Sequence, residues 1–266
     1  MGGAIVCSEG KDGDQWLGRN ASWLDACREC KSVGDRKMVE PSSVSMGKTR
    51  DEIAKAYKSE PWWYDVRGFF ILTFAYNSTL TSQLRLFGPN FGERHLEVAC
   101  GTGTLLELML RWRRWKKLPA VPIVGVDYAE SMLAGARNRF EGKPGLEFMH
   151  ADVAEMPFDT GAFATANVAN AIHCFPEVDA GLRDVFRVLK PGGTMAANVL
   201  LVPRGRWPFR GIAERINRWG IRKGILFTTY EQADIRRRLL SAGFELITEG
   251  VSGNCYNVLA RKPTIP

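Results

Sequence analysis

Short apolar segments alternate with amphipathic segments from residue 95 to the end of the chain. Apolar runs of about four to eight residues predict strands, and apolar positions three or four apart predict helices. The predicted strands are His95–Cys100, Ile123–Asp127, Leu146–Asp152, part of Ala164–Phe175, Thr194–Val202, Glu245–Gly250 and Asn254–Arg261. The predicted helices are Thr104–Lys117, Glu130–Phe140, Glu177–Leu189 and Tyr230–Ala242, with Pro191-Gly192-Gly193 as a stop after the third.

The order of these elements predicts an α/β fold. Strands that alternate with helices favour right-handed crossovers, so we expect a doubly wound, mostly parallel seven-stranded sheet. The last two strands follow each other without a helix between them. They therefore predict a hairpin that gives the sheet an antiparallel edge strand.

The first 45 residues differ from the rest of the chain. They are rich in Gly, Ser, Asp and Lys and show no sustained apolar period, so we expect residues 1–45 to be a disordered or dispensable extension. Residues 46–266 are expected to form a single domain, beginning with a helix at Arg50–Lys58. Within it we expect a helical cap or lid at 46–94, a ligand-binding core at 95–203, an insertion at 204–229, and a final helix and hairpin at 230–266.

Composition narrows the functional classes. Hydrophobic residues make up 45% and charged residues 24% of the chain, which is typical of a globular protein with a sizeable core. There is no secretory signal and no apolar run long enough to cross a membrane, so we expect a cytoplasmic protein. Cys27 and Cys30 form a single CxxC without a second pair, which favours free thiols over a zinc site, and we expect no metal.

The strongest local signal is the segment from Leu96 to Thr104. It predicts a strand that runs into Gly101 and Gly103 and then opens a helix. Glycines at the carboxyl end of a parallel strand let the backbone approach a ligand closely. A lone GxG is weak evidence, but Glu97 lies just before the turn and can accept a hydrogen bond from a ligand.

Two further acids end the next two strands. Asp127 follows Gly103 by 24 residues, the position from which a carboxylate binds ribose hydroxyls, and Asp152 ends the third strand. Leu106 stands where a dinucleotide fingerprint needs its third glycine, and Gly47-Lys48-Thr49 lacks the upstream glycine of a phosphate loop. The pattern therefore favours an adenosine-type ligand other than a dinucleotide.

From about residue 60 to 262 the sequence resembles a class I S-adenosylmethionine-dependent methyltransferase. The resemblance is to the ubiquinone/menaquinone C-methyltransferase-like branch and rests on Leu96–Gly103, Val124–Asp127, His150–Asp152 with Met156–Asp159, and Leu189–Gly193. It implies a Rossmann-like methyltransferase fold, S-adenosyl-L-methionine as cofactor, and methylation of carbon, oxygen or nitrogen in a small molecule. One departure is Ala99, where the family often has glycine.

The resemblance also implies a set of site residues. Glu97, Ala99, Gly101 and Gly103 would line the methionine and ribose end of the cofactor, Asp127 would hold the ribose, and Tyr128, Met132, Asp152 and Val153 would lie toward the adenine. Asn170 and His173, after the fourth strand, would border the methyl group and the acceptor. We expect His173 either to act as a general base or only to shape the pocket.

An aromatic segment at residues 57–76 precedes the core. Aromatic walls exclude water and stabilise a sulfonium through cation–π contact, so we expect a lid that also caps the sheet. Tyr57 and Tyr64 are its candidate pocket members and alternative activators of the acceptor.

The net charge of +7 is concentrated in two basic segments. Residues 111–117 end a predicted helix, where cations favour the helix dipole and a solvated face is the default. Residues 204–223 carry seven Lys or Arg and one Glu around Ile212, Ile216 and Trp219. This stretch predicts either a solvated face or a substrate-covering element that contacts an anionic membrane surface or an acidic acceptor.

Two alternatives to small-molecule methylation stay open at this point. A nucleic-acid methyltransferase would be expected to show a Pro-Cys pair or an Asn/Asp-Pro-Pro-aromatic loop, and neither occurs, so no specific nucleic acid is expected as a partner. A catalytically silent cofactor-binding partner protein is disfavoured by the intact acids at three strand ends. The sequence does not fix the oligomeric state.

Overall fold

A computed structural model of the chain describes residues 78–204, 208–223 and 229–264. The predicted extension at 1–45, the helix at Arg50–Lys58 and the aromatic segment at 57–76 lie outside these residues. The strands are β1 (His95–Val98), β2 (Ile123–Asp127), β3 (Leu146–His150), β4 (Phe163–Val168), β5 (Leu189–Leu200), β6 (Glu245–Ser252) and β7 (Cys255–Arg261). The helices are α3 (Leu80–Phe87), α4 (Thr104–Trp115), α5 (Glu130–Arg139), the 3₁₀ turn η1 (Ile172–Cys174), α6 (Val178–Val188), α7 (Phe209–Lys223) and α8 (Gln232–Ser241).

The strands form one seven-stranded sheet in the order β3-β2-β1-β4-β5-β7-β6. The pairs from β3 to β5 are parallel, with β1 at the centre between β2 and β4. Strand β7 is antiparallel to both β5 and β6, so the predicted hairpin supplies the one reversed strand and β6 lies at the edge. The predicted α/β class and mostly parallel sheet are confirmed.

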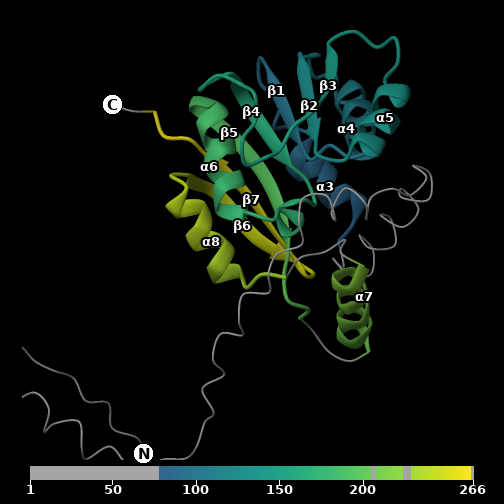
Figure 1. Cartoon of the computed structure of the whole chain (residues 1–266), viewed down its shortest axis with the longest axis vertical. Helices are drawn as coiled ribbons and strands as arrows, with labels where there is room; N and C mark the ends of the chain where they lie inside the picture. Colours follow the sequence, from purple (N-terminus) through teal and green to yellow (C-terminus); the bar gives the residue numbers. More distant parts are fainter. Residues whose placement is uncertain (1–77, 205–207, 224–228, 265–266) are drawn as a thin grey trace, which may run out of the picture. The chain divides into compact units, whose positions relative to one another are not determined.

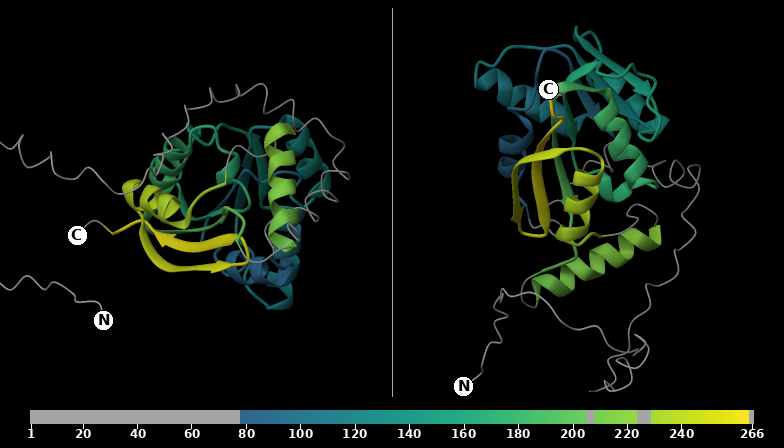
Figure 2. Two further views of the ribbon diagram at one scale, coloured as in Figure 1. Left: turned by 90° about the horizontal axis from the view of Figure 1, so that it is seen from below. Right: turned by 90° about the vertical axis from the view of Figure 1, so that its left-hand side faces the viewer.

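Helices cover both faces of the sheet (Figures 1 and 2). On one face, α6 and α8 bury their apolar stripes, for example Leu182, Val185 and Leu239, against the centre of the sheet. On the other face, α3 and α4 pack through Phe87 and Met109 in a second cluster. Each stripe follows the three-or-four spacing that predicted a helix, because only that spacing puts the apolar side chains on one side.

Strand β5 begins earlier than predicted. The structure continues the strand from Leu189 through the Pro-Gly-Gly stretch that we expected to be a stop, although α6 does end at Val188. Gly192 takes a φ of +77°, and the pairing with β4 shifts register between Phe163 and Thr165. The stretch is therefore an irregular beginning of the strand, since a glycine in the left-handed region accommodates the shift.

The connections bring several loops to one edge of the sheet. Parallel strands β1, β2, β3 and β4 all end at the same edge, where the loops after them lie close together. Among the described residues, no helix has both the length and the apolar character that crossing a bilayer requires.

Candidate functional site

The loop after β1 is held in an unusual backbone conformation. Ala99, Gly101 and Gly103 have φ values of +53°, +57° and +74°, in the left-handed region that favours glycine. Gly103 is the N-cap of α4, and a Cβ at this position would lie 2.6 Å from the ring of Phe140. The two glycines of the motif are thus required by the turn itself, and the loop presents its backbone at the end of β1.

Asp127 joins this loop to the end of β2. One carboxylate oxygen accepts the Gly101 N–H at 2.8 Å, and the other accepts the Ala129 N–H at 2.9 Å. Burial raises the pKa of the Asp127 carboxyl, and the backbone donors only partly oppose that shift. The ionised carboxylate is therefore a strong acceptor for further donors, such as the hydroxyls of a ribose.

The third acid of the predicted edge, Asp152, follows β3. One of its oxygens accepts the Ala154 N–H at 2.9 Å, which fixes the turn after the strand. Beside it, the Tyr128 ring lies tilted against His150 with ring centroids 5.1 Å apart, and an imidazole nitrogen of His150 lies 2.9 Å from the Tyr128 carbonyl. The side chain of Val153, next to Asp152 in the chain, is half-buried and packs against the core.

Glu97 has partners inside the protein. Its side chain is 3% exposed, and one carboxylate oxygen lies 2.9 Å from the His95 ring and accepts the Asn167 amide at 2.8 Å. His95 also contacts Thr165 at 2.7 Å, so both nitrogens of its ring are used. The structure therefore places Glu97 in a buried polar cluster beneath the loop, and Oε1 is committed to this cluster.

The loop after β4 is tied to two other elements through Asn170. The Asn170 side-chain oxygen accepts hydrogen bonds from Gln83 of α3 at 3.0 Å and from Asn198 of β5 at 2.8 Å. The Asn170 N–H donates to the Asn198 oxygen at 2.6 Å, while the residue itself takes a φ of +55°. The side chain that we expected to border the ligand is thus occupied in holding the loop.

His173 lies in η1 and is 5% exposed. Burial lowers its pKa to about 3, because the charged imidazolium loses hydration. The imidazole is therefore neutral near pH 7 and holds an extra proton poorly.

Met132, Tyr57 and Tyr64 complete the set of predicted site residues. Met132 is 1% exposed in α5 and faces the core, whereas Tyr57 and Tyr64 lie outside the described residues.

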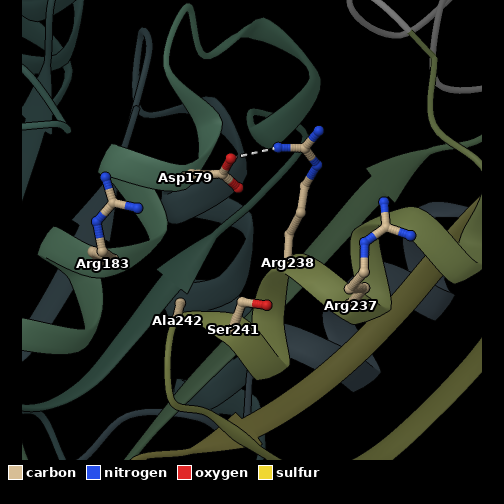
Figure 3. A pocket seen from close by; sticks show the side chains of 6 residues that line it. All are labelled: Asp179, Arg183, Arg237, Arg238, Ser241 and Ala242. Carbon is tan, nitrogen blue, oxygen red and sulfur yellow. Dashed lines mark hydrogen bonds and ion pairs between the residues drawn. The ribbon is translucent and has the colours of Figure 1, made fainter.

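A groove is lined by residues of α6 and α8 (Figure 3). It encloses about 320 Å³ and is lined by Asp179, Arg183, Arg237, Arg238, Ser241 and Ala242. Asp179 and Asp234 pair with its arginines, so much of its positive charge is neutralised.

Within the described part of the chain, no group of three or more His, Cys, Asp or Glu is placed to hold a metal ion.

Sequence reasoning missed the polar residues that support the site. Gln83 and Asn198 hold the loop after β4, and His95 with Asn167 holds Glu97. A signal for part of this was present, because asparagines in otherwise apolar strands need buried partners. His95 and Glu97 are also two residues apart in one strand, which places them on the same face.

The core of the chain is similar to known proteins. Residues 96–193 match the family model described as a methyltransferase domain. Demethylmenaquinone methyltransferases from Thermus thermophilus and Clavibacter sepedonicus are 39% and 35% identical over 105 and 109 residues, or 39% and 41% of this chain. The chain spans 45% and 42% of the lengths of these relatives. The structure of a SAM-dependent methyltransferase from Aquifex aeolicus is similar in fold, with a TM-score of 0.56, 18% identity, and coverage of 77% of this chain and all of that one.

The buried, neutral His173 predicts an acid-sensitive fold. Between about pH 6.5 and 3 the unfolded chain binds a proton at this imidazole that the folded chain excludes, so stability falls as the pH falls through this window. Its contribution to the slope is at most about 1.4 kcal/mol per pH unit. In urea unfolding between pH 7.5 and 4.5, we expect His173→Gln to have a shallower pH dependence than the wild type. Asn138→Gln, at an exposed residue that does not titrate, serves as the control and should keep the wild-type slope; an equal slope in His173→Gln would contradict the prediction.

The Gln83–Asn170 contact predicts a stability cost at α3. Gln83→Leu removes a donor and an acceptor from the Asn170 amide and leaves its Nδ2 without that partner, so we expect a loss of about 1–3 kcal/mol in the free energy of unfolding. The exposed Thr81→Leu on the same helix is the control, with an expected change within about 0.5 kcal/mol. In a double-mutant cycle with Asn170→Gly, the two changes should be non-additive. Additive effects would show that the contact does not hold the loop.

Proposed function

Because residues 96–193 form a methyltransferase domain with the class I fold, we propose that the protein transfers a methyl group from S-adenosyl-L-methionine to a small molecule. The observation that carries this proposal is the bond between the glycine loop after β1 and the Asp127 carboxylate after β2. It puts backbone donors and a carboxylate at the same edge of the sheet, where ligands of open parallel sheets bind.

The residues present fit this cofactor. Asp127 has a raised pKa and gains from the hydroxyl donors of a ribose, while Gly101 and Gly103 hold the loop in the left-handed conformation that presents its backbone at the end of β1. Tyr128, Asp152 and Val153 supply a ring, an acceptor and an apolar surface for an adenine. We assign Glu97 a supporting role beneath the loop, since one oxygen is bound to His95 and Asn167, and we place Met132 in the packing of α5.

The bound cofactor would supply a methyl group on a sulfonium. In the transfer, the bond between sulfur and methyl carbon breaks as the acceptor atom bonds to that carbon; S-adenosylhomocysteine leaves, and an acceptor that carries a proton at that atom gives it up. The protein mainly has to align the two partners and exclude water. With a pKa lowered to about 3, His173 is better suited to shape the pocket in its neutral form than to hold that proton. Tyr57 and Tyr64 stay predictions for this step.

The acceptor that the relatives favour is a small aromatic ring. Both relatives are named for demethylmenaquinone, which supports a quinone-type acceptor over nucleic acid. The silent-partner alternative has less support, because the glycine loop and the carboxylates of Asp127 and Asp152 are all in place. We therefore propose methylation of an apolar ring compound that bears oxygen.

The helix α7 supplies a surface for membrane contact. Its outward face carries exposed Arg215, Arg218 and Arg222 at spacings of three and four, next to half-buried Trp219 and exposed Ile212. Arginines with adjacent tryptophan and isoleucine favour the interface of an anionic bilayer, where an apolar acceptor would dissolve. We propose that α7 brings the protein to such a surface without crossing it, rather than binding an acidic acceptor.

Cofactor binding by Asp127 is testable by calorimetry with S-adenosyl-L-methionine. Asp127→Ala removes a charged acceptor of hydrogen bonds, so we expect the affinity to fall roughly 10- to 100-fold. Gly101→Val should abolish binding, because a branched residue is strained at a φ of +57°. Asp159→Ala, at an exposed acid, is the control. Wild-type affinity in both site variants, or no binding by the wild type, would overturn the proposed function.

Membrane contact by α7 is testable by sedimentation with vesicles. Replacing Arg215, Arg218 and Arg222 by Gln should weaken binding to vesicles of phosphatidylglycerol and phosphatidylcholine roughly 10- to 100-fold at low salt. The control replaces Arg114, Lys116 and Lys117 by Gln, which changes the charge equally at another basic segment. Equal losses in the two variants would show attraction by net charge alone and would remove α7 from the proposal.

A further inference from the structure

One face of α7 is buried and contains an amide with no partner. Ala213, Asn217 and Gly220 lie at spacings of four and three and are all buried, with Asn217 only 6% exposed. Neither the side-chain oxygen nor the side-chain nitrogen of Asn217 has a hydrogen-bond partner. Within the part of the chain that the structure describes, these are the only buried side-chain nitrogen and oxygen atoms in that state.

The contrast with other buried amides makes Asn217 informative. Four other amide side chains are buried to a similar extent, and each has a hydrogen-bond partner in the protein within 3.2 Å. They are Gln83, Asn90, Asn167 and Asn198. A buried polar group without a partner is costly, so each such group in a native protein calls for an explanation, and a functional role is one of them. These four amides are hydrogen-bonded within the protein, whereas the amide of Asn217, which lies between the small residues Ala213 and Gly220, is not.

The connections of α7 place it at the ligand edge of the sheet. The chain leaves β5 at Leu200 and returns at Tyr230, and the two ends are joined by the bonds Val202 N–H to Tyr230 O at 3.1 Å and Tyr230 N–H to Leu200 O at 3.2 Å. Both ends of the α7 segment are thereby fixed at the carboxyl end of β5. The neighbouring strand β4 leads into the loop of Asn170 and His173, and Figure 1 shows α7 beyond the ends of these strands.

We propose that Asn217 binds the methyl acceptor, and that the acceptor is a quinol or quinone ring with one ring oxygen within reach of the amide. The amide oxygen accepts from a hydroxyl of the quinol, and the amide nitrogen donates to a carbonyl oxygen of the quinone. Ala213 and Gly220 carry little or no side chain, so neither residue places bulk beside the amide on this face of α7. This inference rests on the proposed methyl transfer and names the group that orients its acceptor.

The first test compares Asn217→Leu with the wild type without any acceptor. Leucine has a similar size and no polar atoms, so a residue kept for ligand binding should give a more stable free protein when it is replaced. We expect the melting temperature to rise by about 2–6 °C, while the affinity for S-adenosylhomocysteine stays within about twofold. Asn138→Leu, at an exposed asparagine of α5, is the control. A lower melting temperature in Asn217→Leu would indicate a structural amide and overturn the proposal.

The second test measures the acceptor directly. With a short-chain demethylated naphthoquinol and tritium-labelled S-adenosyl-L-methionine, Asn217→Leu should lower kcat/KM roughly 10- to 100-fold, mostly through KM. Equilibrium binding of the oxidised naphthoquinone, followed by quenching of tryptophan fluorescence, should weaken by the same factor. A change within twofold in both measurements would overturn the assignment.

These measurements also separate the two levels of the inference. A wild-type protein that binds no S-adenosylhomocysteine contradicts the proposed function itself. A wild-type protein that binds S-adenosylhomocysteine but neither methylates the quinol nor binds the quinone leaves the methyltransferase assignment standing and rules out this acceptor for Asn217. If the quinone binds but no methyl is transferred, the binding comparison alone decides on Asn217.

Discussion

The hydrogen bond between the Gly101 N–H and the Asp127 carboxylate is the contact on which the rest of the site depends. It connects the loop after β1 to the end of β2 and requires left-handed backbone at Gly101 and Gly103. The strand order makes this contact possible, since β1 and β2 are parallel neighbours in the sheet. Burial raises the pKa of Asp127 because it disfavours the charged carboxylate, and hydrogen-bond donors from a ligand would offset that cost.

On the other side of the site, side-chain amides hold the loop after β4 in place. Asn170 would be strained at a φ of +55° without support, and its bonds to Gln83 and Asn198 hold it there. The loop that follows β4 is therefore fixed from two elements before any ligand arrives, which is the preorganisation that an aligned transfer needs. Asn217 differs, because its buried amide has no hydrogen-bond partner among the described residues.

The sequence predicted most of the fold and the part of the site formed by the loop after β1 and Asp127. The spacing of apolar residues located the strands and helices from β1 to β7 within a few residues, because burial of one or both faces of an element sets that spacing. Glycines and acids at strand ends indicated the Gly101–Asp127 edge. The irregular start of β5 was not predicted, because Pro and Gly usually stop an element, and here Gly192 and Gly193 form backbone hydrogen bonds with Lys262, near the end of the chain. The side-chain partners of Glu97 and Asn170 come from residues up to 87 positions away, which local patterns do not reveal.

The arginines of α8 and those of α7 differ in whether they have acidic partners. On α8 the arginines are matched, with Arg236 bound to Glu249 and Arg238 bound to Asp179 and Asp234. On α7 only Arg210 has an acidic partner, Glu214, among the described residues. Among the described residues, Arg215, Arg218 and Arg222 of α7 have no acidic partner, while carboxylates gather at the strand ends. A cationic cofactor and an apolar acceptor held by a neutral amide both suit that arrangement, because neither needs the arginines, which stay free to contact an anionic surface.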